Sequence, residues 1–476
     1  MILNQTTTTN NSTNQYSSTV SDSDFQKKPD IGAPNALYFD GDSADQDVFA
    51  EMRSNVLLVS GEHYTKRSAN FYRRIRDSKE LSQEQKLRLV KNHTRKICQL
   101  YANNILAPNP GVGFTPKDED SNHDQKVAEI HHSVWMDAVH KYNLMDKKDD
   151  WVDSFVQIGE VHVKIFYDPT LGKIKGYEPQ IDPMTGNPAM DEIGEMTADE
   201  SKPVFEGAFV FEEIYGFNLL RPPECKDLRE AEWLCIRKMV NRNELKRKFK
   251  NDEEKSDMIV SDSDDTYVIF DGVKGGYKKS SKQVMLREYY YRPSQLFPMG
   301  YFYITTKEGI LAEGELPGGF FPIVSATFDK IQTTPRGRSP VKVMRPYQAE
   351  INRTASKIAE HQITLGDDKL LIKNGSKVSA GAQLPGIRSV SYTGEKPDVL
   401  QGRAGDQYLN YMNSQITEMY QVMMVAEDSE PTQENGQLDP YVLLFRSARQ
   451  KKKFQRYIKK FEKFLIELCE LYLNLS

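Results

Sequence analysis

The stretch RGRSPVKVMRPYQAEINRTASKIAEHQITL, residues 336–365, marks a change in the organisation of the chain. Its opening Gly and Pro residues are typical of a turn, and the residues from 341 to 365 favour a helix. At about 1.5 Å per residue, such a helix rises roughly 35 Å. Polar and charged side chains recur along it, as a helix that contacts neighbouring chains would need: Arg345, Gln348, Glu350, Arg353, Lys357 and Glu360.

Downstream of this helix the chain alternates between insert, helix and loop. Residues 366–402 predict a short β-rich insert with strand candidates at 370–372 and 387–392. The remaining segments are expected to be a second helix over 403–424, an acidic, turn-rich loop over 425–440 and a long final helix over 441–476.

The acidic loop contains no Lys or Arg between Met423 and Phe445. An acidic loop between two helices is usually solvent-exposed. Repeated around a ring, however, it would line a hole with negative charge that repels DNA phosphates at every angle, so that DNA slides without sticking. Its five acids are Glu427, Asp428, Glu430, Glu434 and Asp439.

The final helix combines an apolar stripe with a basic first half. The stripe has a 4, 3, 4, 3, 4, 3 spacing, which fits either a coiled-coil seam or an ordinary core-facing helix. The basic residues could meet phosphates, an acidic neighbouring subunit, or only solvent. The stripe comprises Phe454, Ile458, Phe461, Leu465, Leu468, Tyr472 and Leu475, and the basic run begins with Arg446, Arg449, Lys451, Lys452 and Lys453.

Upstream, residues 46–340 are expected to form one mixed α+β body, and residues 1–45 a disordered arm. The arm is rich in Asn, Thr and Ser and cannot bury enough apolar surface to offset the entropy of ordering, unless a neighbour orders it. Within the body, the periodicity predicts helices over 46–106, 125–142 and 151–159, and strands over 161–167, 205–215, 284–291 and 301–306, the last two flanking a hairpin.

Composition excludes several classes of protein. The 476 residues include 63 Lys and Arg against 68 Asp and Glu, a net charge of −5. Proteins that wrap nucleic acid by bulk electrostatics are usually basic, so any such contact is expected to be local. Four dispersed cysteines favour a reducing compartment. Neither a secretory signal nor a membrane-spanning run is expected.

Common catalytic and ligand-binding motifs are missing from the sequence. The glycines around 111–113 do not make a dinucleotide fingerprint, and residues 275–280 lack the spacing of a phosphate-binding loop. There is no HExxH, no EF-hand loop and no Gly-x-Ser-x-Gly. We therefore expect no enzymatic activity, no catalytic residue, no cofactor and no metal.

The order of helix, β insert, helix, acidic loop and long helix resembles the stem, clip, stem, tunnel loop and wing helix of tailed-bacteriophage portal proteins, the head-to-tail connectors, in a podovirus-like form. Gly337, Ser339, Gln348, Asn352 and Ser356 match the family's pattern at the start of the stem. Further stretches resemble the family's wing, and the likeness spans about residues 50–476. They are 97–108, 152–163, 227–246, 288–293, 310–314 and 319–323.

Two departures from the family pattern stand out. Many portals continue into a crown or barrel, so the end at Ser476 predicts a short form or a truncated chain. Residues 436–440 replace the usual Gly-rich exit of the tunnel loop, which leaves the boundary of that loop open.

The resemblance implies an α+β portal fold. Its parts would be a wing over 46–340, stem helices over 341–365 and 403–424, a clip over 366–402, a tunnel loop over 425–440 and a wing or crown helix over 441–476. It implies a ring, usually of twelve subunits, at one capsid vertex of the virion, assembled in the host bacterial cytoplasm. Partners would be double-stranded DNA in the channel, the terminase large subunit, the major capsid protein, and head–tail adaptor and tail proteins, with no membrane.

Candidate site residues follow from these assignments, each with solvated surface as the alternative. The channel is expected to be lined by Glu427, Asp428, Glu430 and Glu434. The stem would contribute Arg345, Arg353 and Lys357. The clip, where terminase and adaptor dock, would contribute Lys369, Lys373 and Lys377.

Two other classes of protein stay open. A nucleic-acid-processing enzyme would use scattered carboxylates and the basic helix, and would show metal-dependent nuclease or ATPase activity. A non-portal capsid or scaffold protein would assemble in many copies rather than in one closed ring.

Overall fold

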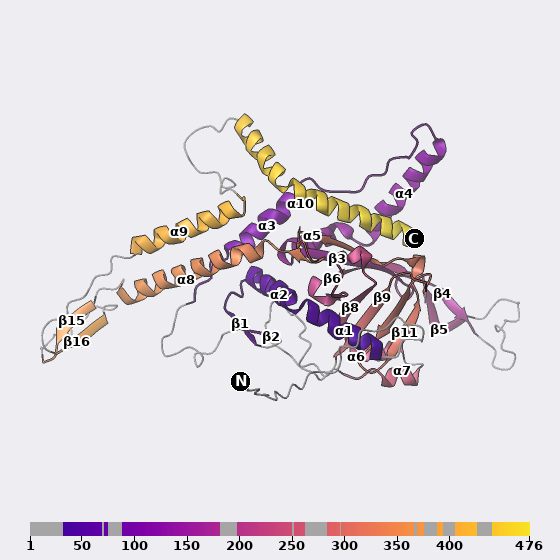
Figure 1. The fold of residues 1–476 in the computed structure, drawn as a ribbon, viewed down its shortest axis with the longest axis horizontal. Coiled ribbons are helices and arrows are strands. Elements are labelled where there is room, and N and C mark those ends of the chain that lie inside the picture. The colour runs from indigo at the N-terminus through magenta and orange to yellow at the C-terminus, as the bar shows by residue number, and fades with distance from the viewer. Residues whose placement is uncertain are drawn as a thin grey trace, which may run out of the picture. The chain divides into compact units, whose positions relative to one another are not determined.

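The computed structural model describes residues 32–68, 71–74, 88–180, 198–249, 252–261, 283–295, 297–365, 369–375, 388–393, 405–425 and 440–476. These residues form a mixed α+β structure, as predicted (Figure 1). The chain divides into two compact units: unit 1 takes residues 1–47, 218–263 and 279–321, and unit 2 takes the rest. Residues 46–340, predicted as one mixed α+β body, contribute to both units.

Unit 1 is built on a five-stranded antiparallel sheet in the order β11-β10-β9-β8-β7. The predicted hairpin is confirmed, since β9 and β10 pair with Tyr291 opposite Tyr301. Helices α6 (Arg242–Lys248) and α7 (Glu253–Asp257) belong to the same unit. The strands are β7 (Leu219–Leu220), β8 (Trp233–Asn241), β9 (Gln283–Tyr291), β10 (Tyr301–Thr305) and β11 (Ile310–Glu315).

Helix α1 (Gly32–Ala44) also belongs to unit 1, where a disordered arm was predicted through residue 45. Tyr38 is buried, and the Arg287 guanidinium lies 4.0 Å from the centre of its ring. Arg237 donates to Asp42 Oδ1 at 2.6 Å, and Arg221 pairs with Asp45 at 2.7 Å. The prediction is therefore wrong for residues 32–45, because these acids and Tyr38 meet arginines from distant strands. Residues 1–31 lie outside the described part of the chain.

Unit 2 is centred on a three-stranded antiparallel sheet in the order β12-β3-β6. The middle strand β3 (Glu160–Asp168) is buried on both faces over its first six residues, so that even His162 and Lys164 are buried. Its neighbours are β6 (Ala208–Ile214) and β12 (Ile323–Thr327). Unit 2 also contains α4 (Asn122–Lys141), α5 (Leu144–Gln157), the ribbon of β4 (Ile174–Pro179) and β5 (Ala198–Phe205), and the short pair β13 (Asp329–Lys330) and β14 (Gly337–Arg338).

Residues 46–106 differ from the predicted helical stretch. Helix α2 (Gln46–Ser60) is followed by an antiparallel hairpin of β1 (Thr65–Ser68) and β2 (Phe71–Arg74). The next helix, α3 (His93–Leu106), begins where Asn92 Oδ1 accepts the Arg95 N–H at 2.9 Å. The amide cap, rather than the apolar periodicity upstream of it, sets this helix start.

Helix α10 (Pro440–Leu475) packs its apolar stripe inside unit 2. Phe461 meets Phe155 at a ring-centre distance of 6.0 Å, and Tyr457 stacks on Phe328 at 4.1 Å. Phe454, Ile458, Phe461, Leu465, Leu468 and Tyr472 are all buried. The stripe therefore faces the core of its own chain, the ordinary alternative to a coiled-coil seam.

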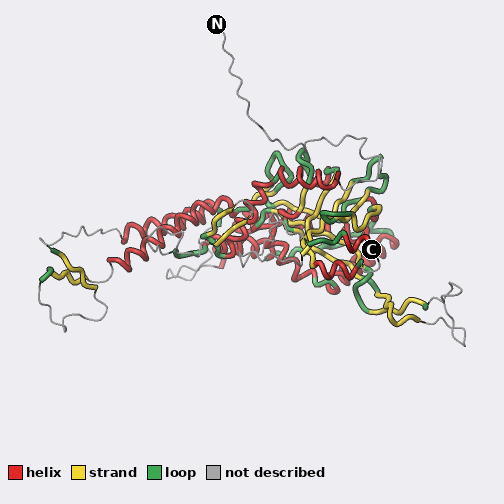
Figure 2. Tube along the Cα trace, turned by 90° about the horizontal axis from the view of Figure 1, so that it is seen from below, coloured by secondary structure: helices red, strands yellow, loops and turns green. Residues whose placement is uncertain are grey.

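The remaining elements follow the predicted order. Helix α8 (Val341–Leu365) lies beside α9 (Gly405–Val422), and the parallel strands β15 (Lys369–Lys373) and β16 (Arg388–Tyr392) stand between them in the chain (Figures 1 and 2). Both helices lie within about two residues of the predicted bounds. None of the described helices has the length and apolar character needed to cross a membrane.

Candidate functional site: the α8–α9 helix pair

The start of α8 is set by two glycines and a serine. Gly159 has φ +98°, and a Cβ there would lie 2.5 Å from the Ser339 backbone nitrogen. A Cβ on Gly337 would overlap the Gly159 carbonyl oxygen. Ser339 Oγ donates to the Val156 carbonyl at 2.8 Å and accepts the Val341 N–H at 3.1 Å. The chain can therefore cross the end of α5 closely and begin α8 with a serine cap.

Below these glycines lies a buried ion pair. Arg336 Nη1 donates to Glu160 Oε1 at 3.1 Å and to the Gly216 carbonyl at 3.2 Å, and both side chains are fully buried. Glu160 also accepts the Gly337 N–H at 3.3 Å. Burial raises the pKa of Glu160, but Arg336, His162 and the Gly337 N–H outweigh it and lower that pKa to about 2.

One face of α8 presents a polar stripe, which we define as Gln348, Asn352 and Ser356. Gln348 Oε1 accepts the backbone N–H groups of His93 at 2.9 Å and Thr94 at 3.1 Å. Gln348 Nε2 donates to the Lys91 carbonyl at 2.6 Å. The four-residue spacing places all three side chains on one side of the helix.

The rest of the polar stripe continues along the same extended segment. Asn352 Oδ1 accepts the Lys91 N–H at 3.0 Å, and Ser356 Oγ accepts the Leu89 N–H at 3.0 Å. The stripe thus supplies partners for backbone groups of residues 89–94 that no strand or helix pairs. All three of its residues are buried.

The two helices of the pair run antiparallel. Tyr347 Oη on α8 donates to Glu418 Oε1 on α9 at 3.3 Å. Met412, Met419 and Tyr420 are the buried residues of α9. Just past its end, the Met423 carbonyl accepts the Tyr101 hydroxyl of α3 at 2.8 Å. Helix α3 therefore supports the pair at the end where α8 begins and α9 ends.

The three predicted stem residues have different surroundings. Arg345 Nη2 donates to Asn55 Oδ1 of α2 at 2.6 Å and is partly buried, so it helps to fix α8 within unit 2. Arg353 is 65% exposed and pairs with Glu350, one turn before it, at 2.7 Å. Lys357 is exposed. Arg353 and Lys357 are thus the two predicted stem residues that remain accessible.

The predicted clip residues lie at the strand pair. Lys369 and Lys373 are the first and last residues of β15, and Lys373 is exposed. Strand β15 pairs with β16 of the same chain, with Lys369 opposite Arg388. Lys377 lies outside the described residues. So do the predicted channel residues Glu427, Asp428, Glu430 and Glu434, between α9 and α10.

Several basic residues of α10 form contacts within their own chain. Arg446, Arg449 and Lys451 lie on the helix, and their side chains fall outside the described part of the chain. Lys453 Nζ donates to the Met424 carbonyl at 3.2 Å, and Lys452 is exposed. Further along, Arg456 pairs with Asp329 at 3.3 Å and Lys460 Nζ donates to the Phe328 carbonyl at 2.6 Å.

No family model and no curated protein matches the sequence. Among the residues that the structure describes, no three His, Cys, Asp or Glu side chains gather closely enough to hold a metal ion. The sequence alone does not predict the pair Glu160–Arg336, because its members are separated by 176 residues and neither belongs to a motif.

Proposed function

We propose that this chain is the subunit of a portal ring, the channel through which a tailed phage packages and ejects its DNA. The observation that supports the proposal most directly is the start of α8. Gly337, Ser339, Gln348, Asn352 and Ser356, the residues on which the resemblance rests, are each engaged in a close crossing or a hydrogen bond there. Together they hold the base of a long helix firmly.

The order of the elements supports the same proposal. A firmly based helix of 25 residues leads to a small strand pair, a second helix of 18 residues returns, and a 36-residue helix follows. In the proposed ring, α8 and α9 form the stem, and the β15–β16 pair forms the clip on which terminase and adaptor dock. Ring closure is the natural result of a head-to-tail interface whose rotation closes.

Charge supports a channel in which DNA is not held tightly. The segment 426–439 carries all five acids of the predicted tunnel loop and no basic residue. Copies of this segment around a ring would repel phosphates from every side, and their effect on DNA would weaken with added salt. The major capsid protein would surround the wing, and the chain itself would hydrolyse nothing.

The test is negative-stain electron microscopy of the purified protein together with mass determination. We expect closed rings of about twelve copies with a central hole that admits a DNA duplex. Nuclease and ATPase assays with Mg²⁺ serve as the control, and we expect no turnover in either. A stable monomer that cleaves DNA or hydrolyses ATP would contradict the proposal and favour a nucleic-acid-processing enzyme. Large shells of many copies would favour a capsid or scaffold protein.

A further inference from the structure

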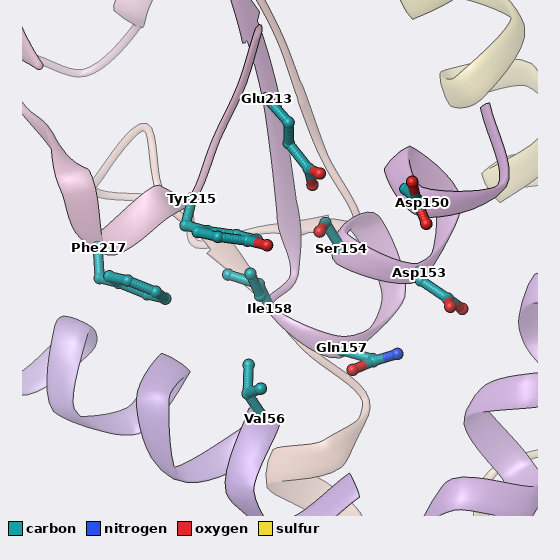
Figure 3. A pocket seen from close by; sticks show the side chains of 9 residues that line it. All are labelled: Val56, Asp150, Asp153, Ser154, Gln157, Ile158, Glu213, Tyr215 and Phe217. Atoms are coloured by element: carbon teal, nitrogen blue, oxygen red, sulfur yellow. The ribbon is translucent and has the colours of Figure 1, made fainter. Parts of the chain in front are cut away.

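A pocket of about 380 Å³ lies within unit 2, lined by residues of α2, α5 and the end of β6 (Figure 3). One side carries the carboxylates of Asp150, Asp153 and Glu213. The other carries the ring of Tyr215, which stacks on Phe217 with ring centres 5.5 Å apart. Acidic groups and an aromatic wall thus face the same space.

The Glu213 carboxylate is only partly satisfied. It forms a hydrogen bond with the Ser154 hydroxyl, and burial raises its pKa to about 7, with Asp150 and Asp153 adding to the effect. Its Oε1 atom is fully buried and has no hydrogen-bond partner among the described residues. A buried acceptor without a partner is costly, so this atom favours a ligand that donates a hydrogen bond.

The charges around the pocket leave it acidic. No Lys, Arg or His is among the described residues that line it. Cations lie outside the lining. The guanidinium of Arg53 is 5.4 Å from the centre of the Phe217 ring. Burial and Asp150 raise the pKa of Asp153, and Arg95 partly opposes them. The pocket therefore suits a positive group brought from outside.

The ring of Tyr215 indicates which type of cation fits the pocket. Tyr215 is 45% exposed, so its ring is available to a hydrocarbon stem or to the flat face of a guanidinium. Among the described residues the carboxylates do not converge as a metal site requires. An extended organic cation can reach separate carboxylates, whereas a single metal ion cannot.

We propose that this pocket binds an organic cation, a guanidinium or a primary ammonium carried on an apolar stem. The cation donates to Glu213 Oε1, Asp150 adds charge at the exposed side, and the stem lies against Tyr215. The group can come from a free polyamine or from a Lys or Arg side chain of a neighbouring copy. The site does not depend on the proposed portal function.

Isothermal titration calorimetry with agmatine, and with 1-pentanol as the uncharged analogue, tests the proposal. We expect agmatine to bind and pentanol not to bind. Glu213→Gln keeps the shape of the side chain, and we expect it to weaken agmatine binding about tenfold to hundredfold, the usual effect of losing a hydrogen bond to a charged group. Asp150→Asn changes an exposed residue and should weaken binding less.

Matched controls remove a carboxylate that does not line the pocket. Glu212→Gln is next to Glu213 on β6, and Asp149→Asn is next to Asp150 on α5. Neither should change binding. The affinity of the wild type should rise by up to about tenfold from pH 6 to pH 8, because a carboxyl with a pKa of about 7 ionises over that range.

Sedimentation velocity of the wild type and the two pocket variants separates the two sources of the cation. Weaker assembly of the variants would assign the group to a side chain of a neighbouring copy, and unchanged assembly would assign it to a free polyamine. Two results would overturn the proposal: agmatine produces no binding heat, or it binds the Glu213→Gln and Asp150→Asn variants as well as it binds the wild type.

Discussion

At the residue scale, the crossing of residues 336–339 over the end of α5 rests on groups that tolerate little change. Gly159 and Gly337 leave no room for a Cβ, and Arg336 and Glu160 are both fully buried beneath them. The Arg336 guanidinium also lies 5.0 Å from the centre of the Phe49 ring of α2. One arginine thus links β3, α2 and the segment that leads into α8.

Arg336→Met should destabilise the protein by about 3–5 kcal/mol, because it leaves the Glu160 carboxylate buried without its cation. Urea unfolding measures the change in stability, with a spectroscopic signal that reports on unit 2 alone. As a matched control, Arg353→Ala removes an exposed arginine whose pair with Glu350 lies on the helix surface, and should leave the midpoint unchanged.

The double variant Arg336→Met with Glu160→Gln tests whether the two residues act as a pair. Its destabilisation should be smaller than the sum of the two single effects, because the neutral side chain no longer needs a cation. Additive effects would show that the two residues act independently.

At the element scale, α8 is held by its polar stripe and α10 by its apolar stripe. The apolar stripe repeats with helical periodicity and buries large rings against α5, as the pair Phe461–Phe155 illustrates. The polar stripe has the same periodicity, but its side chains form hydrogen bonds with the backbone of residues 89–94, as a neighbouring strand would. Each helix is therefore held by one stripe of side chains: α10 by the burial of apolar surface, and α8 by hydrogen bonds.

Gln348→Ala should lower the free energy of unfolding by about 1–3 kcal/mol, because the buried Thr94 N–H loses its partner. The His93 N–H and the Lys91 carbonyl keep the hydrogen bond to each other at 2.9 Å. Hydrogen exchange measured by mass spectrometry should show faster exchange at residues 89–94. Gln362→Ala is the control, since Gln362 is an exposed glutamine on the same helix. Equal exchange in both variants would mean that the stripe does not hold this segment.

At the scale of the whole molecule, the chain consists of two units with separate cores. Leu245, Ile259, Val284, Leu286 and Leu311 form a cluster in unit 1. In unit 2, Phe464 of α10 packs on Trp151 of α5, and Tyr457 of α10 packs on Phe328. The closed ring, its channel and its partners stay predictions that electron microscopy tests.

Scanning calorimetry should resolve two unfolding transitions, because chains with several cores often depart from two-state behaviour. Leu311→Ala removes a buried side chain from unit 1 and should lower one transition, and Leu468→Ala does the same for unit 2 and should lower the other. A single transition shifted alike by both variants would show instead that the two units unfold as one.

The sequence by itself determined the features that depend on local spacing. The bounds of α8 and α9, the β9–β10 hairpin and the apolar stripe of α10 all follow from residues within a few turns of one another. Only the tertiary structure decided that this stripe faces the core of its own chain. The polar stripe is also visible in this way, since Gln348, Asn352 and Ser356 recur every fourth residue. What local spacing does not show is the partner of that stripe, which lies more than 250 residues away.

Only the tertiary structure decided the features that join distant segments. Helix α1 is ordered by arginines of strands β8 and β9, so composition alone misplaced it in a disordered arm. The ion pair Glu160–Arg336 and the acidic pocket around Glu213 likewise need strands and helices that meet after long connections. The physical reason is the same in each case: periodicity acts between covalent neighbours, whereas burial and charge pairing depend on the path of the whole chain.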